Sequence, residues 1–263
     1  MITIKSVSII GSGNLAYHIS RAVINSSAYR LKGIFGRNER RVKRLAEQVG
    51  CEFDMMEGPT TFDSDLAILC VSDDAILEVL KQNHFASETL IVHIAGSVPL
   101  SIFNDCGIQN GGVFYPLQTF SQSREIEFQE VPVFIEAQHP LGLTELQDLA
   151  LDFGAASRVL DSDKRLQLHL AAVFASNFTN SLMVAAESIV NDIGLDFRVL
   201  RPLLTEVVEK GALIGPRQAQ TGPARRGDEQ TMKKHLNALK NEEMKQLYRL
   251  MSALIRKQSH ETR

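Results

Sequence analysis

The chain has 263 residues, of which 44% are hydrophobic and 22% are charged, the proportions of an ordinary globular protein with room for a substantial core. Its net charge of −3 gives no reason to expect nucleic acid or an anionic membrane as a partner. The scattered cysteines, Cys51, Cys70 and Cys106, indicate reduced thiols in a cytoplasmic protein rather than a disulfide framework, and no cluster of metal ligands is apparent.

Short β-branched runs alternate with helical patterns through the first 155 residues. We expect strands at 6–10, 31–35, 66–71, 90–94, 112–115 and 131–135, and helices at 15–25, 39–49, from about 74, 99–105 and 143–153. This alternation predicts an α/β fold, a doubly wound and mainly parallel Rossmann sheet covered by helices on both faces.

The pattern becomes helical after a short run near 157–160. Asp161 or Ser162 is expected to cap a long helix that reaches about residue 192 and stops at Gly194. Further helices are expected at 197–214, 228–240 and 242–257. The sequence therefore predicts two domains, a dinucleotide-binding domain at 1–157 and an all-helical domain at 158–263. The long helix carries too many polar residues for a lipid-facing span, and the start of the chain lacks signal-peptide features, so we expect a cytoplasmic protein.

A glycine-rich turn directly follows the first strand and opens a helix. Gly11 permits the tight turn, Gly13 lets a pyrophosphate approach the backbone, and Ala16 permits close packing of the helix on the strand. The free N–H groups at the helix start favour an anion. The motif predicts a dinucleotide site made by Gly11, Ser12, Gly13, Asn14, Leu15 and Ala16, against the alternative of a glycine turn that binds nothing.

The end of the second strand indicates which dinucleotide is bound. An NAD-selective fold would usually place an acidic residue here to bond the ribose 2′-hydroxyl, whereas this chain has Arg37 followed by Asn38, Arg40 and Arg41. A guanidinium can hold a 2′-phosphate through two parallel hydrogen bonds. We therefore expect NADP(H) rather than NAD(H), bound by Arg37, Asn38 and Arg41, although Arg40 and Arg41 also suit the solvated face of the next helix.

Three later strand ends should face the same crevice, because ligands of open α/β sheets bind outside the carboxyl ends of the strands. We expect the cofactor to meet Val71, Ser72, Asp73, Ala95 and Gly96. Ser97 and Gln118 are candidate catalytic residues, and Thr119 is placed to meet a substrate. His93 is as readily explained as a buried strand histidine.

The long helix has one polar side. At 100° per residue, Ser176 and Asn180 lie within about 20° of His169, and Asn177 lies at about 80°. Such a stripe either lines a cleft or makes hydrogen bonds between helices. We expect His169 and Asn177 to be catalytic and Ser176 and Asn180 to contact substrate.

A glycine- and arginine-rich segment, 221–228, lies between the later helices. Gly222 and Pro223 would fix its backbone, while Arg225 and Arg226 offer forks for a carboxylate or phosphate. Asp228 can cap the following helix. The alternative is an ordered interhelical turn with exposed arginines.

The motifs NLA (14–16), VSDDAI (71–76) and HIAGS (93–97), followed by an all-helical domain, resemble the superfamily of pyrroline-5-carboxylate reductases, 6-phosphogluconate dehydrogenases and β-hydroxyacid dehydrogenases. HLAAVFASNF (169–178) and TGPARRGD (221–228) resemble an uncharacterised group of NADP oxidoreductases. The resemblance covers essentially the whole chain. It implies a homodimer joined through the C-terminal helices, and leaves open whether Arg225 and Arg226 act in their own subunit or its neighbour.

The resemblance also bears on the chemistry. The hydroxyacid enzymes carry a Lys and an Asn four residues apart on this helix, and matching Asn177 to that Asn puts Val173 in the place of the Lys. His169 could then serve as the general acid. An imine reduction needs less from the protein, although the SPGGTT loop of the pyrroline-5-carboxylate reductases is replaced by TGPARRGD.

The sequence thus predicts hydride transfer between NADP(H) and a small carbonyl or imine substrate with an acidic group. The alternative is a non-catalytic NADP(H)-binding sensor or regulatory protein. The replacement of Lys by Val173 favours the sensor slightly, and the clustering of His169, Ser176 and Asn177 opposes it.

Overall fold

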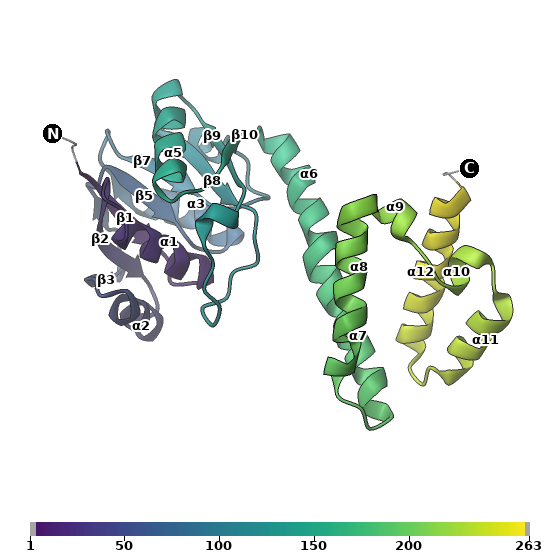
Figure 1. Cartoon of the computed structure of the whole chain (residues 1–263). Coiled ribbons are helices and arrows are strands. Elements are labelled where there is room, and N and C mark those ends of the chain that lie inside the picture. Colours follow the sequence, from purple (N-terminus) through teal and green to yellow (C-terminus); the bar gives the residue numbers. More distant parts are fainter. Residues whose placement is uncertain (1–3, 261–263) are drawn as a thin grey trace. The chain divides into compact units, whose positions relative to one another are not determined.

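A computed structural model describes residues 4–260 of the chain (Figure 1). The chain divides into two compact units, Met1–Ser176 and Asn177–Arg263. Within residues 4–260, the strands and the helices that cover them lie in the first unit, and the second unit is helical.

The first unit is built on an eight-stranded sheet in the order β10-β9-β8-β7-β5-β1-β2-β3. Its strands are β1 (Lys5–Ile10), β2 (Tyr29–Gly36), β3 (Phe53–Met55), β5 (Leu66–Leu69), β7 (Leu90–His93), β8 (Gly111–Pro116), β9 (Val133–Ala137) and β10 (Ser157–Val159). Two short strands, β4 (Thr61–Phe62) and β6 (His84–Phe85), pair separately. The doubly wound, mainly parallel sheet predicted from the sequence is confirmed.

One strand pair runs the other way. β9 lies antiparallel to β8, and its connection contains only the short 3₁₀ helix η1 (Phe128–Glu130). Parallel neighbours need a crossover of a dozen or more residues, usually a helix. The chain instead returns directly beside β8, so the sheet ends in a reversed strand.

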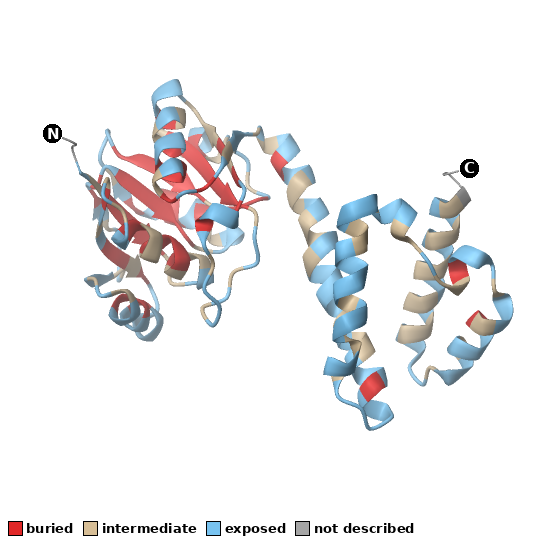
Figure 2. Ribbon diagram, viewed as in Figure 1, coloured by how far each residue is buried: buried red, intermediate tan, exposed pale blue. Residues whose placement is uncertain are grey.

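Five helices cover the two faces of the sheet. α1 (Asn14–Ile24), α2 (Glu39–Val49) and α5 (Pro140–Asp152) pack on one face through one buried cluster, and α3 (Asp73–Gln82) and α4 (Ile102–Asp105) pack on the other through a second. The red, buried positions in Figure 2 follow the strands and also mark parts of the covering helices. Near-continuous apolar strands such as β5 suit this burial on both faces.

The long helix expected after residue 161 is present. Asp161 caps α6 (Ser162–Ala172) by accepting a hydrogen bond from the Lys164 N–H. The long helix ends with α7 (Thr179–Asp192), just before Gly194, which has a φ of 77°. The middle of the helix, η2 (Val173–Phe178), is π-helical, and α7 follows it. A π turn holds more residues than an α turn, so the uniform 100° spacing used for the polar stripe does not apply across this segment.

The second unit continues from α7 through η3 (Phe197–Leu200), α8 (Arg201–Ile214), α9 (Pro216–Ala219), α10 (Pro223–Arg226), α11 (Glu229–Ala238) and α12 (Glu242–His260). Asp228 caps α11 by accepting from the Thr231 N–H, as predicted. Large apolar side chains are exposed along several of these helices, for example Val184 in α7, Val208 in α8 and Leu250 in α12.

Among residues 4–260, one helical stretch, Ser162–Asp192, is long and apolar enough to cross a membrane when judged by length and composition alone. Helices that bury an apolar face in a protein interior or interface meet the same criterion.

Candidate functional site

The turn after β1 can be made only by glycine. Gly11 has a φ of 124°, and a Cβ placed on it would lie 2.2 Å from the carbonyl oxygen of Cys70 at the end of the neighbouring β5. Its N–H donates to the carbonyl of Phe35 on the other neighbour, β2, at 2.8 Å. The backbone therefore passes between two strands with no space for a side chain.

Gly13, the N-cap of α1, differs from Gly11 because it has space for a side chain. A Cβ on Gly13 would meet no atom within 4 Å, and the residue has an ordinary φ of −80°. No side chain caps this helix end, and its first turn carries no acidic residue. Nothing in the described residues requires glycine here, whereas a pyrophosphate lying against the free N–H groups would. The turn fits a dinucleotide.

Arg37 follows the buried end of β2. Its guanidinium donates from Nη1 to Oε1 of Glu78 on α3 at 2.8 Å, and both side chains are largely exposed. Asn38 caps α2, since its Oδ1 accepts from the Arg41 N–H at 3.0 Å. The strand end thus presents Arg37 beside the glycine turn while Asn38 holds the start of the next helix.

These elements enclose a cavity of about 770 Å³. Of the expected cofactor residues, those that line it are Gly11, Ser12, Gly13, Arg37, Asn38, Arg41, Val71 and Ser72. Asn14, Leu15, Ala16, Asp73, Ala95 and Gly96 do not line it. Ala16 is fully buried against the sheet, and the Asn14 amide donates to the Phe120 carbonyl at 2.9 Å.

The cavity also has walls that sequence reasoning missed, contributed by Met56, Glu57, Gly58, Pro59, Ala75, Glu78, Val79, Lys81, Gln82, Asn83 and His84. Most belong to α3 or to the segments next to the small β4–β6 sheet. Of these residues, only those on the exposed side of α3 could have been predicted from the sequence. This helix starts at a strand end that faces the crevice, so its exposed side chains are expected near the cofactor.

The ends of β5 and β7 bring further polar groups together. The Ser97 hydroxyl donates to the Asp73 carboxylate, which links the loop after β7 to the start of α3. Ala95 and Gly96 are buried beside them. His93, also buried, stacks on Phe103 and accepts at Nδ1 from the Ala95 N–H at 3.3 Å. Burial, assisted by the Arg165 charge, lowers the pKa of His93 to about 3, so this ring is neutral.

His169 on α6 lies against this edge. Its Nδ1 is 3.1 Å from the hydroxyl of Tyr115 in β8, and a Cβ on Gly96 would lie 2.6 Å from the same nitrogen. His169 is half-buried, while Tyr115 is only 8% exposed. The structure therefore brings His169 to the loop that contains Gly96 and Ser97, within one compact unit.

The start of α6 is anchored by a buried ion pair. Arg165 is 1% exposed, and its guanidinium donates to the Glu136 carboxylate of β9 and to the Val98 carbonyl. The Ser162 hydroxyl donates to Glu136 at 2.8 Å and accepts from the Leu100 N–H at 2.9 Å. These contacts, which the sequence did not reveal, hold α6 one turn before His169.

The other predicted site residues are at least partly exposed, and some contact residues close to them in the chain. Gln118 is exposed, and its Oε1 accepts from the Thr119 N–H at 2.8 Å. Ser176 is half-buried, whereas Asn177 and Asn180 are exposed. Arg225 and Arg226 are both exposed, and Arg225 donates to the carbonyls of Gln218 and Gln220 and so holds its own loop.

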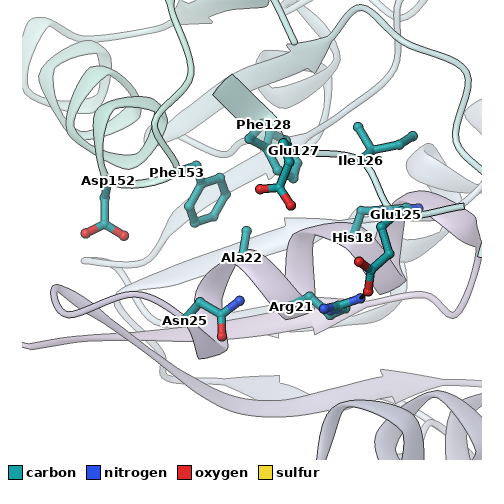
Figure 3. A pocket seen from close by; sticks show the side chains of 10 residues that line it. All are labelled: His18, Arg21, Ala22, Asn25, Glu125, Ile126, Glu127, Phe128, Asp152 and Phe153. Carbon is teal, nitrogen blue, oxygen red and sulfur yellow. Dashed lines mark hydrogen bonds and ion pairs between the residues drawn. The ribbon is translucent and has the colours of Figure 1, made fainter. Parts of the chain in front are cut away.

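A smaller hollow of about 170 Å³ lies between α1, the loop before η1 and the end of α5 (Figure 3). An ion pair of Arg21 with Glu125, at 2.7 Å, crosses part of it. None of the predicted site residues line it. In residues 4–260, no group of three or more His, Cys, Asp or Glu side chains could hold a metal ion.

The parallel sheet, the glycine turn and the cavity at the carboxyl ends of its strands define a Rossmann-type α/β protein. Residues 6–96 match the family described as "NADP oxidoreductase coenzyme F420-dependent", and residues 131–255 match "Domain of unknown function (DUF2520)". No curated protein matches the chain.

A solved structure that matches over almost the whole length of the chain identifies the family. A Bacteroides fragilis protein assigned as an NADP oxidoreductase is 33% identical over 98% of this chain and 100% of that one, with a TM-score of 0.89. The protein belongs to this NADP oxidoreductase family.

More distant structures share the fold. A 1-pyrroline-5-carboxylate reductase from Streptococcus pyogenes is 17% identical over 98% of each chain, with a TM-score of 0.61. A reductive aminase from Aspergillus terreus is 13% identical over 98% of this chain and 95% of that one, with a TM-score of 0.67.

Proposed function

We propose that the protein transfers a hydride between NADP(H) and a small carbonyl or imine substrate that carries an acidic group. The observation that carries this proposal is the open space beside Gly13, in a cavity that Arg37 also lines. A glycine that its own fold does not require, at an uncapped helix start, is suited to a phosphate group.

The cofactor residues would act in two groups. The N–H groups of Gly11–Gly13 and the start of α1 would hold the pyrophosphate, and Arg37 would hold the 2′-phosphate, with Asn38 and Arg41 beside it. Val71, Ser72, Asp73, Ala95 and Gly96 would hold the ribose and nicotinamide. Bound NADPH would supply the hydride.

The protein's own part in the chemistry is to orient the substrate and move a proton. His169 would give its proton to the carbonyl oxygen or imine nitrogen, and Ser97, Gln118 and Asn177 would orient that group. Ser176, Asn180, Arg225 and Arg226 would contact the rest of the substrate and its anion. The reductive aminase that shares this fold was solved with NADPH and ethyl levulinate, so reductions of carbonyls and imines are the first to test.

We also propose a cytoplasmic homodimer. The three cysteines are free in the structure, as suits a reducing compartment. Apolar side chains exposed along α7, α8 and α12 are too numerous for a monomer, and a second copy would cover them.

Gly13→Ala tests cofactor binding. The new methyl group has open space in the unliganded protein, so the variant should melt within about 2 °C of the wild type. NADPH affinity, measured by calorimetric titration, should fall by at least about tenfold because the methyl group occupies the pyrophosphate position. Unchanged affinity, or no binding of either pyridine nucleotide to the wild type, would refute the cofactor proposal.

Hydride exchange with a panel of oxo acids and cyclic imines tests catalysis, with the reduced form of coenzyme F420, which the family description names, as a further hydride partner. His169→Ala and Asn177→Ala should lose turnover while still binding NADPH. Full turnover in both variants would remove the catalytic assignment. NADPH binding without exchange on any substrate would favour the non-catalytic sensor.

A further inference from the structure

The buried Tyr115 contacts the half-buried His169 at the edge of the proposed active site. Tyr115 is the fifth residue of β8, a strand that is buried throughout, and its hydroxyl reaches Nδ1 of His169 at 3.1 Å. The two rings meet edge to face, with centroids 6.0 Å apart and planes at 76°. The tyrosine therefore contacts the histidine through one defined ring nitrogen.

Gly96 confines the ring from another side. A Cβ at this position would lie 2.6 Å from Nδ1, 2.7 Å from Cγ and 2.9 Å from Cβ of His169. Gly96 is not among the glycines with a positive φ, so the backbone conformation does not require glycine here. What requires it is the close approach of the imidazole. The ring is held between a bare backbone segment and the Tyr115 hydroxyl.

We propose that Tyr115 is a positioning residue for the reaction, holding Nδ1 of His169 in both protonation states so that Nε2 is the atom that exchanges the proton with substrate. This inference rests on the proposed function. When the ring is an imidazolium, Nδ1–H donates to the tyrosine oxygen. When the ring is neutral, the same hydroxyl can accept from Nδ1–H or donate to a bare Nδ1.

The proton balance is simple for reduction. The hydride forms the new C–H bond, the Nε2–H bond of the imidazolium breaks, and an O–H or N–H bond forms on the substrate. His169 is left neutral with its proton on Nδ1, still donating to Tyr115, and regains a proton at Nε2 from water.

Tyr115 itself does not supply the proton. Burial raises the pKa of its hydroxyl; the Arg165 charge lowers it and the Asp73 charge raises it. Arg165 lies on α6 and Asp73 lies at the start of α3. The tyrosine hydroxyl therefore stays protonated at neutral pH and serves only as a hydrogen-bond partner of the histidine.

A double-mutant cycle tests this role on single-turnover hydride transfer. Tyr115→Phe should slow the step about tenfold and shift its pH profile, with NADPH affinity and KM within about twofold of the wild type. In a His169→Gln background the same substitution should change nothing further, because the residue acts through the imidazole. An equal loss in both backgrounds would overturn the proposal. Tyr17→Phe, which removes the hydroxyl that accepts from Arg21 on α1, is the matched control.

A second measurement does not depend on finding a substrate. In ¹⁵N-labelled protein without cofactor, the His169 signals are assigned by their loss in His169→Gln. The Nδ1 resonance should move in Tyr115→Phe and stay in place in Tyr17→Phe. An unmoved Nδ1 resonance refutes the contact. A moved resonance with no turnover on any substrate refutes the proposed function and leaves the hydrogen bond established.

Discussion

Arg37 does not stand free beside the cavity. Its partner Glu78 lies on α3, so the pair joins the end of β2 to the opposite wall. The exposed side chains, 60% for Arg37 and 43% for Glu78, make this a weak pair in water. A 2′-phosphate brought to Arg37 would compete with a carboxylate already bound there. The proposed selectivity for NADP(H) would then depend on both residues.

Glu78→Gln tests this competition. Removing the carboxylate charge frees Arg37 and removes a repulsion, so NADPH should bind about three- to tenfold more tightly while NADH changes little. Titrations of both nucleotides provide the measurement, with the exposed Glu47→Gln on α2 as the charge-matched control. Weaker NADPH binding in Glu78→Gln would show instead that the carboxylate orients the arginine. Arg37→Ala should abolish the preference, and Arg40→Ala should leave it.

The cofactor residues predicted from local motifs include several that the structure brings together. Gly11, Gly13 and Arg37 lie together in one cavity because they follow adjacent strands. Nothing in the sequence pointed to Tyr115 or Glu78, whose proposed roles depend on contacts with residues 54 and 41 positions away along the chain. Arg225 was expected at a substrate, yet its guanidinium also holds the carbonyls of its own loop, an arrangement that composition does not reveal.

At the scale of elements, the attachment of α6 to the sheet positions His169. Arg165 is enclosed among Glu136, the Val98 carbonyl and Ser162, one helical turn before the histidine. Burying a guanidinium costs free energy because the charged group loses its contact with water. If its carboxylate partner is removed, that cost remains and the attraction that offset it is lost. The stability of this joint therefore depends on the pair being complete.

Glu136→Ala should destabilise the first unit by about 3 kcal/mol and increase hydrogen exchange over the start of α6. Chemical denaturation and exchange measured by mass spectrometry would show both effects. Lys164→Ala is the matched control, because its pair with Asp161 is largely exposed and should be worth less than about 1 kcal/mol. Equal effects in the two variants would mean that the buried pair does not anchor the helix.

The strand and helix pattern of the first unit was predictable because each strand and helix is marked by the spacing of its own apolar residues, which neighbouring positions in the sequence reveal. The predicted bounds of α2, 39–49, agree with the structure. Other features were missed. The strands β3, β4 and β6 have only two or three residues each, too few to show a period. The reversal of β9 depends on the path of the connecting loop, and the π-helical turns of η2 carry no sequence period of their own.

At the scale of the whole molecule, the second unit buries few apolar side chains for its length. Among its described residues the buried hydrophobic ones are Val190, Ala224 and Met232, whereas α8 alone exposes Leu203, Val207, Val208 and Leu213 by 60% or more. Leu203, Val207 and Ile214 lie within about 40° of one another on the α8 surface. A helix face of this kind needs a partner, and the proposed partner is a second copy of the chain.

The mass of the protein in solution tests that partner. Wild-type protein should sediment at twice the 29.2 kDa of the chain, and the double variant Leu203→Asp/Val207→Asp should sediment at the chain mass, because two buried charges on each subunit would oppose association. Leu141→Asp, at a site 85% exposed on α5, should leave the dimer intact. NADPH binding reports whether the first unit of the double variant is still folded, since its expected cofactor residues all precede α6. A wild-type protein at the chain mass at micromolar concentration, or a double variant that remains at twice that mass, would rule out association through this face of α8.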